Sequence, residues 1–398
     1  MTTADRLLFT ILSSSRSILW SMGIRGRSLL PLAVTSLAVA SCSAAAPSGS
    51  GSAHASAPTA SPSLRSPSLR SPSLRSPSLR SPSPRSPSPR SASPANSARP
   101  GTVVPGRALP APAGLVPFGP VAAGQGAWRP AGRTVAENGR SVRAVYETTL
   151  IPPGGTQSAG IAWLDTGLLA ARLYSGSVSP GGGPYRYTAP IQPAQAATLV
   201  AAFNGGFKMN QARGGYYTEG RMIDPLRAGA ASLVIYADGS VGIGAWGRDV
   251  TMTPQVVSVR QNLLPLVAGG RPTPRAASAR WQAWGSTCGA ASCGPTVPGI
   301  EHQWRSGLGI TADGALVYVA GPALDPLQLA QLLVRAGAVR GMQLDINPDW
   351  PVFVTYDPPA GGRAAAANGR KLLPGTVQGP STFFEAWWAR DFITMSVR

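Results

Sequence analysis

A proline-containing repeat at residues 61–90 excludes regular structure from a large part of this chain. It consists of six five-residue units, four of sequence Ser-Pro-Ser-Leu-Arg and two of sequence Ser-Pro-Ser-Pro-Arg. Each proline removes a backbone amide donor and blocks a helix, and few apolar side chains are present to offset the entropy cost of order. We therefore predict a disordered stalk over 42–114 and assign the folded structure to one domain at 115–398.

An export signal is predicted ahead of the stalk, over residues 1–41. The apolar run at 28–41 follows Arg25 and Arg27, and it is too short for a comfortable transmembrane helix but suits the core of a signal peptide. The run ends in Val-Ala-Ser directly before Cys42, a pattern typical of the lipobox of bacterial lipoproteins. We expect Cys42 to carry a lipid, and the alternative is a non-lipidated signal that happens to contain a cysteine.

The segment that begins at Met22 already has the proportions of a complete signal, so either Met22 is the true start or residues 1–21 extend the leader. In both cases we expect the rest of the chain to work outside the cytoplasm. The predicted location is the cell membrane, through the lipid anchor at Cys42, or the extracellular medium if the signal is not lipidated.

Charge and composition exclude several classes of function. The formal net charge is +19, but eleven arginines and a single acid, Asp5, lie in residues 1–100, so much of the charge belongs to the leader and stalk. The stalk lacks interleaved aromatic residues, so nucleic-acid binding is not expected. The chain has two histidines, His54 and His302, which excludes a multi-histidine metal site.

No cofactor is predicted, and a divalent cation is possible but not indicated by any motif. The segment from Asp345 to Asp349 superficially resembles a calcium-binding loop, but Trp350 stands where such a loop needs glycine. Cys288 and Cys293 are expected to form a small disulfide in an exported protein. A catalytic cysteine is less well supported, because His302 is its only possible histidine partner in the domain.

The domain itself reads as an α+β fold with mostly antiparallel or mixed sheets and few helices. Two hairpins are predicted at 232–246 and 307–321, each with an Asp-Gly pair, at 238–239 and 313–314, that suits a type I′ turn. Further strands are predicted at 160–165, 168–174, 198–204, 338–347 and 351–356.

One helix is clearly marked. Asp325 occupies the N-cap position, Pro326 the first helical position, and Gly337 the position of a C-terminal cap. Apolar residues cover a wide face of the segment between them, so the helix is expected to be well buried. A second, shorter helix is predicted near 192–199.

The first cluster of candidate binding residues follows the predicted strand at 198–204. Asn204 offers both a donor and an acceptor, and Gly205 and Gly206 allow a sharp turn and the close approach of a ligand. Phe207 completes this candidate substrate-binding segment. The alternative is an ordinary turn at the end of a strand.

A second cluster contains Tyr217 and Glu219, an aromatic ring and a carboxylate of the kind that hold a sugar. The alternative is a tyrosine-containing strand with a solvated glutamate. A third cluster contains Gln343, Asp345 and Asn347, of which the first two would share one face of a strand. Arg305 adds a guanidinium that suits a phosphate, although an arginine at a strand start is more often a surface residue.

The order of these segments resembles the phosphodiester glycosidase family, which includes the enzyme that uncovers mannose 6-phosphate by removing N-acetylglucosamine. The resemblance spans roughly 159–356 and rests on Asn-Gly-Gly at 204–206, Arg-Ser-x-x-Gly from Arg305 and Leu-Asp at 344–345. After Asp345 this chain has Ile-Asn-Pro-Asp-Trp in place of the family's glycine and serine run. This departure implies a divergent bacterial member with an altered specificity.

The resemblance implies a hydrolase that cleaves a glycosyl-phosphate bond in a wall polymer or another exported glycan. Arg305 would neutralise the phosphate, and Asp345 or Glu219 would act as base, as nucleophile or as stabiliser of an oxocarbenium-like centre. Two alternatives stay open: a non-catalytic lipoprotein that binds a carbohydrate or phosphosugar in the same cleft, and a structural surface protein.

Overall fold

The computed structural model describes residues 103–398, with gaps at 120–122, 279–280 and 285–300. The predicted signal peptide, most of the predicted stalk and all three cysteines lie outside these residues, so the predictions made for Cys42, Cys288 and Cys293 stay predictions. Within the described part of the chain, no helix has the length and apolar character needed to cross a membrane.

Three β-sheets make up the described part of the chain. Sheet 1 has the order β1 (Arg129–Glu137), β2 (Arg140–Leu150), β3 (Ala159–Leu164), β14 (Leu316–Leu324), β13 (Gln303–Thr311), β15 (Ala338–Gln343), β11 (Pro265–Ala268) and β12 (Arg271–Pro272). Sheet 2 has the order β7 (Arg221–Asp224), β6 (Tyr216–Thr218), β10 (Val256–Gln261), β8 (Ala231–Tyr236) and β9 (Val241–Ala245). Sheet 3 has the order β17 (Gly369–Lys371), β16 (Phe353–Tyr356), β5 (Leu199–Asn204), β18 (Phe392–Val397) and β4 (Leu169–Tyr174).

The prediction of an α+β fold is wrong, because these sheets are the whole framework of an essentially all-β domain. Every ladder between the named strands is antiparallel. The described helices are α5 (Pro326–Arg335), the one-turn α2 (Pro193–Ala196) and α3 (Met209–Ala212), and the 3₁₀ turns Trp281–Trp284, Ala366–Asn368 and Thr382–Phe384. A single ten-residue helix covers part of one sheet and does not form a layer of its own.

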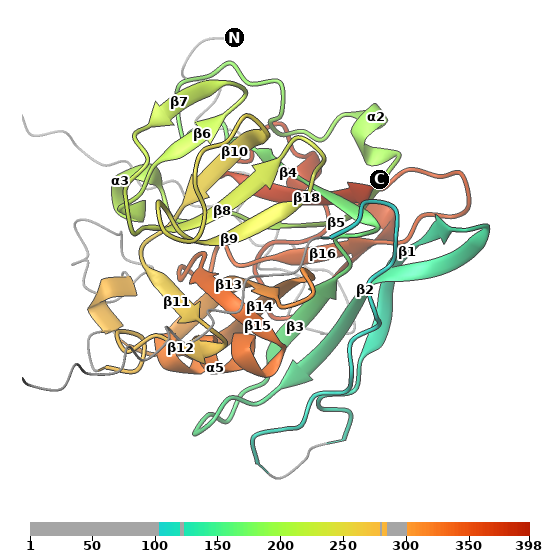
Figure 1. Cartoon of the computed structure of the whole chain (residues 1–398). Helices are drawn as coiled ribbons and strands as arrows, with labels where there is room; N and C mark the ends of the chain where they lie inside the picture. Colours follow the sequence, from blue (N-terminus) through green and yellow to red (C-terminus); the bar gives the residue numbers. More distant parts are fainter. Residues whose placement is uncertain (1–102, 120–122, 279–280, 285–300) are drawn as a thin grey trace, which may run out of the picture. The chain divides into compact units, whose positions relative to one another are not determined.

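Helix α5 packs on sheet 1 as its sequence pattern predicts. The Asp325 side chain accepts a hydrogen bond from the Gln328 amide at 2.6 Å, which caps the helix. Gly307 and Gly309 of β13 let the helix approach closely, because a Cβ at these positions would lie 3.1 Å and 3.3 Å from Leu329 and Leu333 side-chain atoms. Figure 1 shows α5 beside β13 and β15, with β8, β9 and β10 on the other side of these strands.

Both predicted hairpins form, as β8–β9 and β13–β14. Their turns are not of type I′, because only the glycines, Gly239 and Gly314, have positive φ. In the first turn the Asp238 carboxylate accepts a hydrogen bond from the Ser240 amide at 2.9 Å, so the aspartate closes the turn with its side chain.

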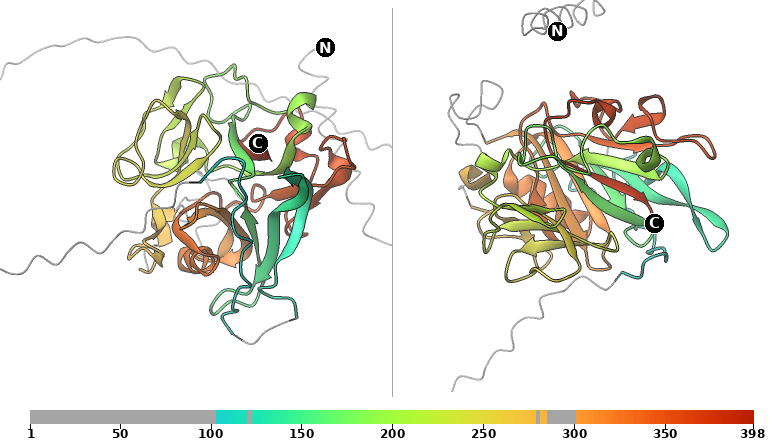
Figure 2. Two further views of the ribbon diagram at one scale, coloured as in Figure 1. Left: turned by 45° about the vertical axis from the view of Figure 1, so that its right-hand side comes forward. Right: turned by 90° about the horizontal axis from the view of Figure 1, so that it is seen from above.

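The strands predicted at 160–165 and 168–174 also form, but in different sheets. β3 pairs with β2 and β14 in sheet 1, whereas β4 pairs with β18 in sheet 3. The β1–β2 hairpin, which the sequence analysis did not predict, projects from one side of the domain (Figure 2). Residues 106–109 of the predicted stalk already contact the domain, for example through the Leu109 amide, which donates to Asp165 at 2.9 Å.

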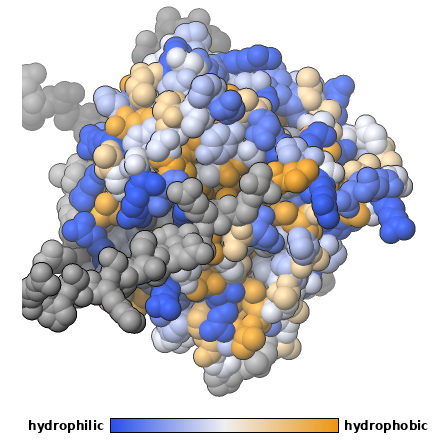
Figure 3. Space-filling model, in the orientation of Figure 1, coloured by the Kyte–Doolittle hydropathy of each residue, from blue (hydrophilic) through white to orange (hydrophobic). Residues whose placement is uncertain are grey.

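The main apolar core lies where the three sheets meet. It combines Leu308 and Met342 of sheet 1, Leu233 of sheet 2, and Leu173 and Phe203 of sheet 3, all at most 2% exposed. On the outer surface apolar and polar residues are interspersed (Figure 3). Since each sheet contributes to one core, strand ends from all three sheets come close together, and the candidate site lies there.

Candidate functional site

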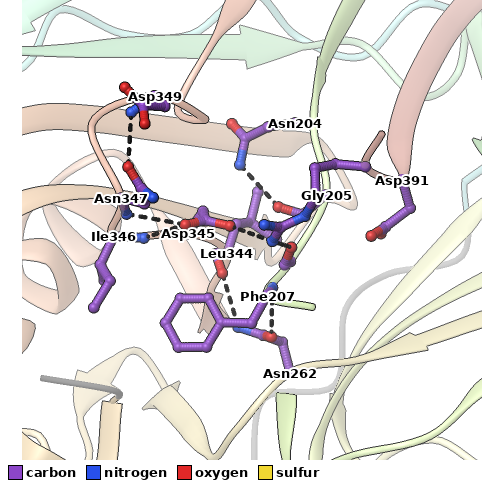
Figure 4. Close-up of polar contacts among 12 residues, drawn as sticks. Asn204, Gly205, Phe207, Asn262, Leu344, Asp345, Ile346, Asn347, Asp349 and Asp391 are labelled. Carbon is purple, nitrogen blue, oxygen red and sulfur yellow. Dashed lines mark hydrogen bonds and ion pairs between the residues drawn. The ribbon is translucent and has the colours of Figure 1, made fainter. Parts of the chain in front are cut away.

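A buried cluster of polar side chains lies at this junction (Figure 4). Sheet 3 contributes the residues that follow β5 and precede β18, sheet 1 contributes the loop after β15, and sheet 2 contributes the end of β10. Of the sequence-predicted residues, the structure brings together Asn204, Gly205, Asp345 and Asn347 at this place (Figure 4). Gly206 belongs to the same place, because its carbonyl accepts from Arg390 Nη2 at 2.7 Å. We call this cluster the Asp345 site.

Asn204 connects the sheets at this site. Its Oδ1 accepts hydrogen bonds from the Tyr318 hydroxyl at 2.8 Å and from the Val352 amide at 3.1 Å. Its Nδ2 donates to Ser306 Oγ at 3.0 Å and to the Gly205 carbonyl at 2.8 Å. Both ends of the amide are therefore occupied by protein groups, and Asn204 positions the site in this structure instead of facing an open space.

Gly205 and Gly206 are required by close packing. A Cβ on Gly205 would lie 2.1 Å from Asp391 Oδ2, and a Cβ on Gly206 would lie 2.8 Å from Asn262 Oδ1 and 2.9 Å from Arg260 Nη2. The glycines thus bring the backbone against a buried ionic pair, a role that the sequence analysis had assigned to the approach of a ligand.

Asp345 is 3% exposed and fully engaged by the protein. Its Oδ2 forms an ion pair with Arg390 Nη2 at 2.7 Å, and its Oδ1 accepts from the amides of Ile346 at 2.8 Å and Asn347 at 3.0 Å. The pKa of the Asp345 carboxyl is raised above its ordinary value, mainly by burial and to a smaller extent by nearby Asp391. Arg390 and the two amides act in the opposite direction and offset only part of this increase. The carboxylate is held in one orientation by three donors.

A second ion pair supports the first. Asp391 Oδ2 accepts from Arg260 Nε at 2.8 Å, and both side chains are at most 1% exposed. Arg260 also donates to the Phe207 carbonyl, and the Phe207 amide donates to Asn262 Oδ1 at 3.0 Å. The predicted binding residue Phe207 therefore acts through its backbone, while its ring lies in the apolar core under sheet 1.

Two buried donors at the site have no partner among the described residues: Arg390 Nε and Trp388 Nε1. Both residues are 5% exposed. The Arg390 guanidinium lies 4.9 Å from the centre of the Trp350 ring, and the Trp350 and Trp388 rings meet edge to face at 5.3 Å. An unsatisfied buried N–H is costly. Arg390 Nε belongs to the guanidinium that pairs with Asp345, and Trp388 is connected to this guanidinium through the Trp350 ring.

Arg305 does not reach Asp345. It is wholly buried and donates to the Leu324 carbonyl at 2.6 Å, the Glu301 carbonyl at 2.7 Å and Gln343 Oε1 at 2.8 Å. Burial lowers the pKa of its guanidinium to about 10. Its donors serve protein acceptors, which gives no support to the predicted contact of Arg305 with a phosphate; Arg390 is the arginine that contacts Asp345.

Gln343, like Arg305, forms its hydrogen bonds with other protein groups and not with Asp345. Besides accepting from Arg305, it donates from Nε2 to the Trp284 carbonyl at 3.0 Å. The strand β15 ends at Gln343, so the expected common face of Gln343 and Asp345 is not formed. Gln343 is thus a structural partner of Arg305.

Glu219 and Tyr217 lie elsewhere, in and beside the tight turn between β6 and β7. Glu219 has a φ of 51° and accepts hydrogen bonds from the amides of Arg186 at 3.0 Å and Tyr187 at 2.9 Å. The Tyr217 ring packs on a small cluster of valines that includes Val259. Neither residue contacts Asp345, so the structure does not join the second predicted cluster to the third.

The described residues contain no group of three or more His, Cys, Asp or Glu side chains that could hold a metal ion. The carboxylates of the Asp345 site are paired with arginines. This donor set binds anionic or neutral oxygen ligands better than cations.

Sequence reasoning missed Arg260, Asn262, Trp388, Arg390 and Asp391. Arg260 and Asn262 carry no distinctive local signal, because the polar run Arg-Gln-Asn at 260–262 has the composition of an ordinary strand end. The run Trp-Trp-Ala-Arg-Asp at 387–391 did carry one, since aromatic rings, a cation and an acid together before a strand are a composition typical of binding sites.

No protein-family profile matches the chain, and no curated protein matches it. Among solved structures, the chain resembles the catalytic domain of zebrafish N-acetylglucosamine-1-phosphodiester alpha-N-acetylglucosaminidase, auto-inhibited by its pro-peptide, with a TM-score of 0.41 and 14% identity over 67% of this chain and 87% of that one. It also resembles a hypothetical protein from Synechocystis, with a TM-score of 0.34 and 12% identity over 64% of this chain and 62% of that one. TM-scores below 0.5 do not establish a shared fold, so the function is argued from the site.

Proposed function

We propose that this chain is a hydrolase that cleaves the bond between a sugar and a phosphodiester in a glycan outside the cytoplasm. The observation that carries the proposal is the buried ion pair of Asp345 with Arg390, whose Nε has no partner among the described residues, together with the unpartnered Nε1 of Trp388, whose ring packs on Trp350 next to that guanidinium. The order of the Asn-Gly-Gly, Arg-Ser-x-x-Gly and Leu-Asp segments supports it, because the first and last of them meet at this site.

The chemistry assigns a role to each of these groups. Arg390 and Trp388 donate hydrogen bonds to the oxygens of the phosphate, which leaves as a stable anion and needs little acid assistance. Asp345 acts on the sugar side, as nucleophile or as stabiliser of the oxocarbenium-like centre. The bond between the anomeric carbon and the phosphate oxygen breaks. Water supplies the hydroxyl of the released sugar, and the remaining proton of the water goes to the phosphomonoester.

In this proposal Arg390 takes the role that the sequence analysis gave to Arg305, and Glu219 has no role in catalysis. Arg390 can serve both sides at once, because its Nη2 donates to Asp345 and to the Gly206 carbonyl, each at 2.7 Å, while its buried Nε has no partner among the described residues. The arginine therefore fixes the carboxylate at a set distance from the bound phosphate.

A second candidate function is binding of a phosphorylated sugar without turnover. It is favoured by the engagement of both Asp345 oxygens and by the segment Ile346–Trp350, which replaces the glycine and serine run of the resembled family with bulkier residues. The two candidates predict different outcomes when the same substrate is supplied.

The test uses the full-length protein, a panel of sugar-1-phosphodiesters and crude wall polymer, with released sugar followed by mass spectrometry and new phosphomonoester by phosphorus NMR. Turnover should fall at least 100-fold in Asp345→Asn and about 10-fold or more in Trp388→Phe, which removes the Nε1 donor and keeps a smaller aromatic ring against Trp350. Asp349→Asn is the matched control, because the described hydrogen bonds of Asp349 come from its backbone. Saturable shifts of the phosphorus signal without turnover would select the binding function, and neither turnover nor binding would overturn both.

We also propose that the chain is exported and lipidated at Cys42 and that Cys288 and Cys293 form a disulfide. The support is the sequence alone: the signal-like segment, the small residues before Cys42 and the redox state expected outside the cytoplasm. Mass spectrometry of the purified protein tests both, since a diacylglycerol mass on a peptide that starts at Cys42 should disappear in Cys42→Ala, and a 288–293 peptide should gain two hydrogens on reduction.

A further inference from the structure

A cavity of about 840 Å³ lies between sheets 2 and 3. None of the residues that contact Asp345 lines it. Its wall on one side consists of β4 and β18, and on the other side of β6, β8 and β10. We call it the arginine groove, after the residues that dominate its lining: Arg172, Arg186, Tyr187, Ser258, Thr394 and Arg398.

The alternation of β4 explains why a cation faces this space. Leu169, Ala171 and Leu173 are buried in the core where the sheets meet, whereas Arg172, which alternates with them, is exposed. Because β4 is the edge strand of sheet 3, residues of both its faces line the groove, among them Ala171, Arg172 and Leu173. The register places Thr394 of β18 directly opposite Arg172, so a hydroxyl lies beside the guanidinium.

Tyr187 holds two guanidinium groups in place. The Arg172 guanidinium lies 4.2 Å and that of Arg186 5.3 Å from the centre of its ring, within the range of cation–π contacts. Glu219 holds the backbone of this segment in place, because its carboxylate accepts hydrogen bonds from the amides of both Arg186 and Tyr187. Among the described residues neither arginine side chain forms an ion pair, so their N–H edges remain open to an anion.

A third guanidinium lies further along the groove. Arg398 donates from Nε to the Thr166 carbonyl at 3.0 Å, and its Nη2 is buried without a partner in the described part of the chain. Thr394, opposite Arg172, and Arg398 are four residues apart on or next to β18, which corresponds to about 13 Å along the strand at about 3.3 Å per residue. The groove therefore presents two separate places for anionic groups.

Acidic and hydroxyl groups lie between these cations. Glu219 and Asp238 also line the groove, which gives it three arginines against two carboxylates. The hydroxyls of Ser258 and Thr394 are part of the same lining. A ligand that fits needs anionic groups beside the arginines and uncharged hydroxyl groups beside the carboxylates, which would repel further phosphates.

We propose that the arginine groove binds a polyol or glycan chain that carries more than one phosphate. This inference goes beyond the proposed function, because it concerns a different part of the domain and does not require Asp345 to be catalytic. Binding of a polymer there would give the protein a hold on a wall polymer that is independent of turnover at the Asp345 site.

The test measures binding of a fluorescent glycerol-phosphate oligomer to the full-length protein by anisotropy at about 0.1 M salt. The double variant Arg172→Gln/Arg186→Gln should bind at least 10-fold more weakly than the wild type. Arg140→Gln is the matched control, because it removes an exposed arginine that lines none of the described cavities, and it should leave the affinity within about twofold. Equal losses in both variants, or no loss in the double variant, would overturn the proposal.

Three further probes define the ligand class. Inorganic phosphate should compete only weakly, because it fills one of the two anionic places, and neutral dextran should not compete. Inorganic polyphosphate that competes as well as the glycerol-phosphate oligomer would overturn the requirement for hydroxyl groups. Asp345→Asn should bind the oligomer as tightly as the wild type does, because Asp345 does not line the groove. A wild type that binds the oligomer but shows no turnover would contradict only the proposed hydrolase, whereas turnover without oligomer binding would contradict only the proposal for the groove.

Discussion

The residues of the Asp345 site illustrate how a functional candidate and a structural support differ in their contacts. The amide of Asn204 and the guanidinium of Arg305 form hydrogen bonds with other protein groups, so both side chains position their neighbours. Arg390 and Trp388 each keep one buried donor without a partner in the described residues. Four other described side-chain atoms are also buried without a partner, at Gln125, Thr148, Ser179 and Arg398, so it is the ion pair with Asp345 that distinguishes Arg390.

At the residue scale, Gly205→Ala should destabilise the domain strongly. The new Cβ would lie 2.1 Å from Asp391 Oδ2 and 2.7 Å from the Asp391 carbonyl oxygen, so the backbone or the buried ion pair must shift. We expect a loss of about 2–4 kcal/mol in the free energy of unfolding, measured by urea denaturation. The control Gly379→Ala places a Cβ with nothing within 4 Å, and an equal loss in both variants would contradict the packing explanation.

Asp345 should also give the stability a distinctive pH dependence. Burial raises the pKa of its carboxyl in the folded state above the ordinary value of 3.8, so the folded state binds the proton more tightly than the unfolded state. The wild type should therefore gain stability relative to Asp345→Asn as the pH falls through the folded pKa towards about 4. Urea denaturation at several pH values measures this difference.

The control for the pH experiment is Glu385→Gln, which removes an exposed carboxylate. The difference between wild type and Glu385→Gln should vary less with pH than the difference for Asp345→Asn. A wild type that loses stability relative to Asp345→Asn on acidification would mean that the ion pair with Arg390 outweighs desolvation.

At the element scale, the sequence predicted what depends on local chemistry. The capped helix α5, both Asp-Gly hairpins and the strand that ends at Asn204 all form, because caps, turns and alternation act between residues close in sequence. The partners of β3 and β4 were not predictable in this way. Pairing with β14 and β18 joins residues more than 150 positions apart, and nothing in either strand encodes its neighbour.

The cap of α5 provides the prediction at this scale. Asp325→Ala removes the acceptor of the Gln328 amide at 2.6 Å and should reduce the free energy of unfolding by about 1 kcal/mol, measured by urea denaturation. Asp325→Asn keeps an acceptor and should restore most of the loss. If both variants lose the same amount, the stabilisation comes instead from the charge of Asp325 near His302, whose Nε2 lies 3.7 Å from its carboxylate.

At the scale of the whole molecule, the site could be predicted only in part because it forms between sheets. The Asn-Gly-Gly and Leu-Asp segments were found from the sequence, and the structure brings them together. Arg260 and Asp391 were not found, since they are 131 residues apart and become partners only when sheets 2 and 3 meet. The predicted fold class was wrong for a related reason. The signals for helix α5 are local and were recognised, whereas the three sheets that make the domain essentially all-β arise from strand pairings between distant residues, which local sequence patterns do not reveal.

The same junction predicts how the molecule unfolds. Asp391→Asn leaves the Arg260 guanidinium buried without its ion pair, which should lower the free energy of unfolding by about 3–5 kcal/mol. Asp357→Asn breaks the exposed pair with Arg143 and should cost at most about 1 kcal/mol. Because the buried pair joins sheets 2 and 3 and contacts the backbone after β5, hydrogen exchange in Asp391→Asn should lose protection in β5 and β10 together. Loss confined to sheet 3 would show that the sheets unfold separately and that the ionic cluster is not what unites them.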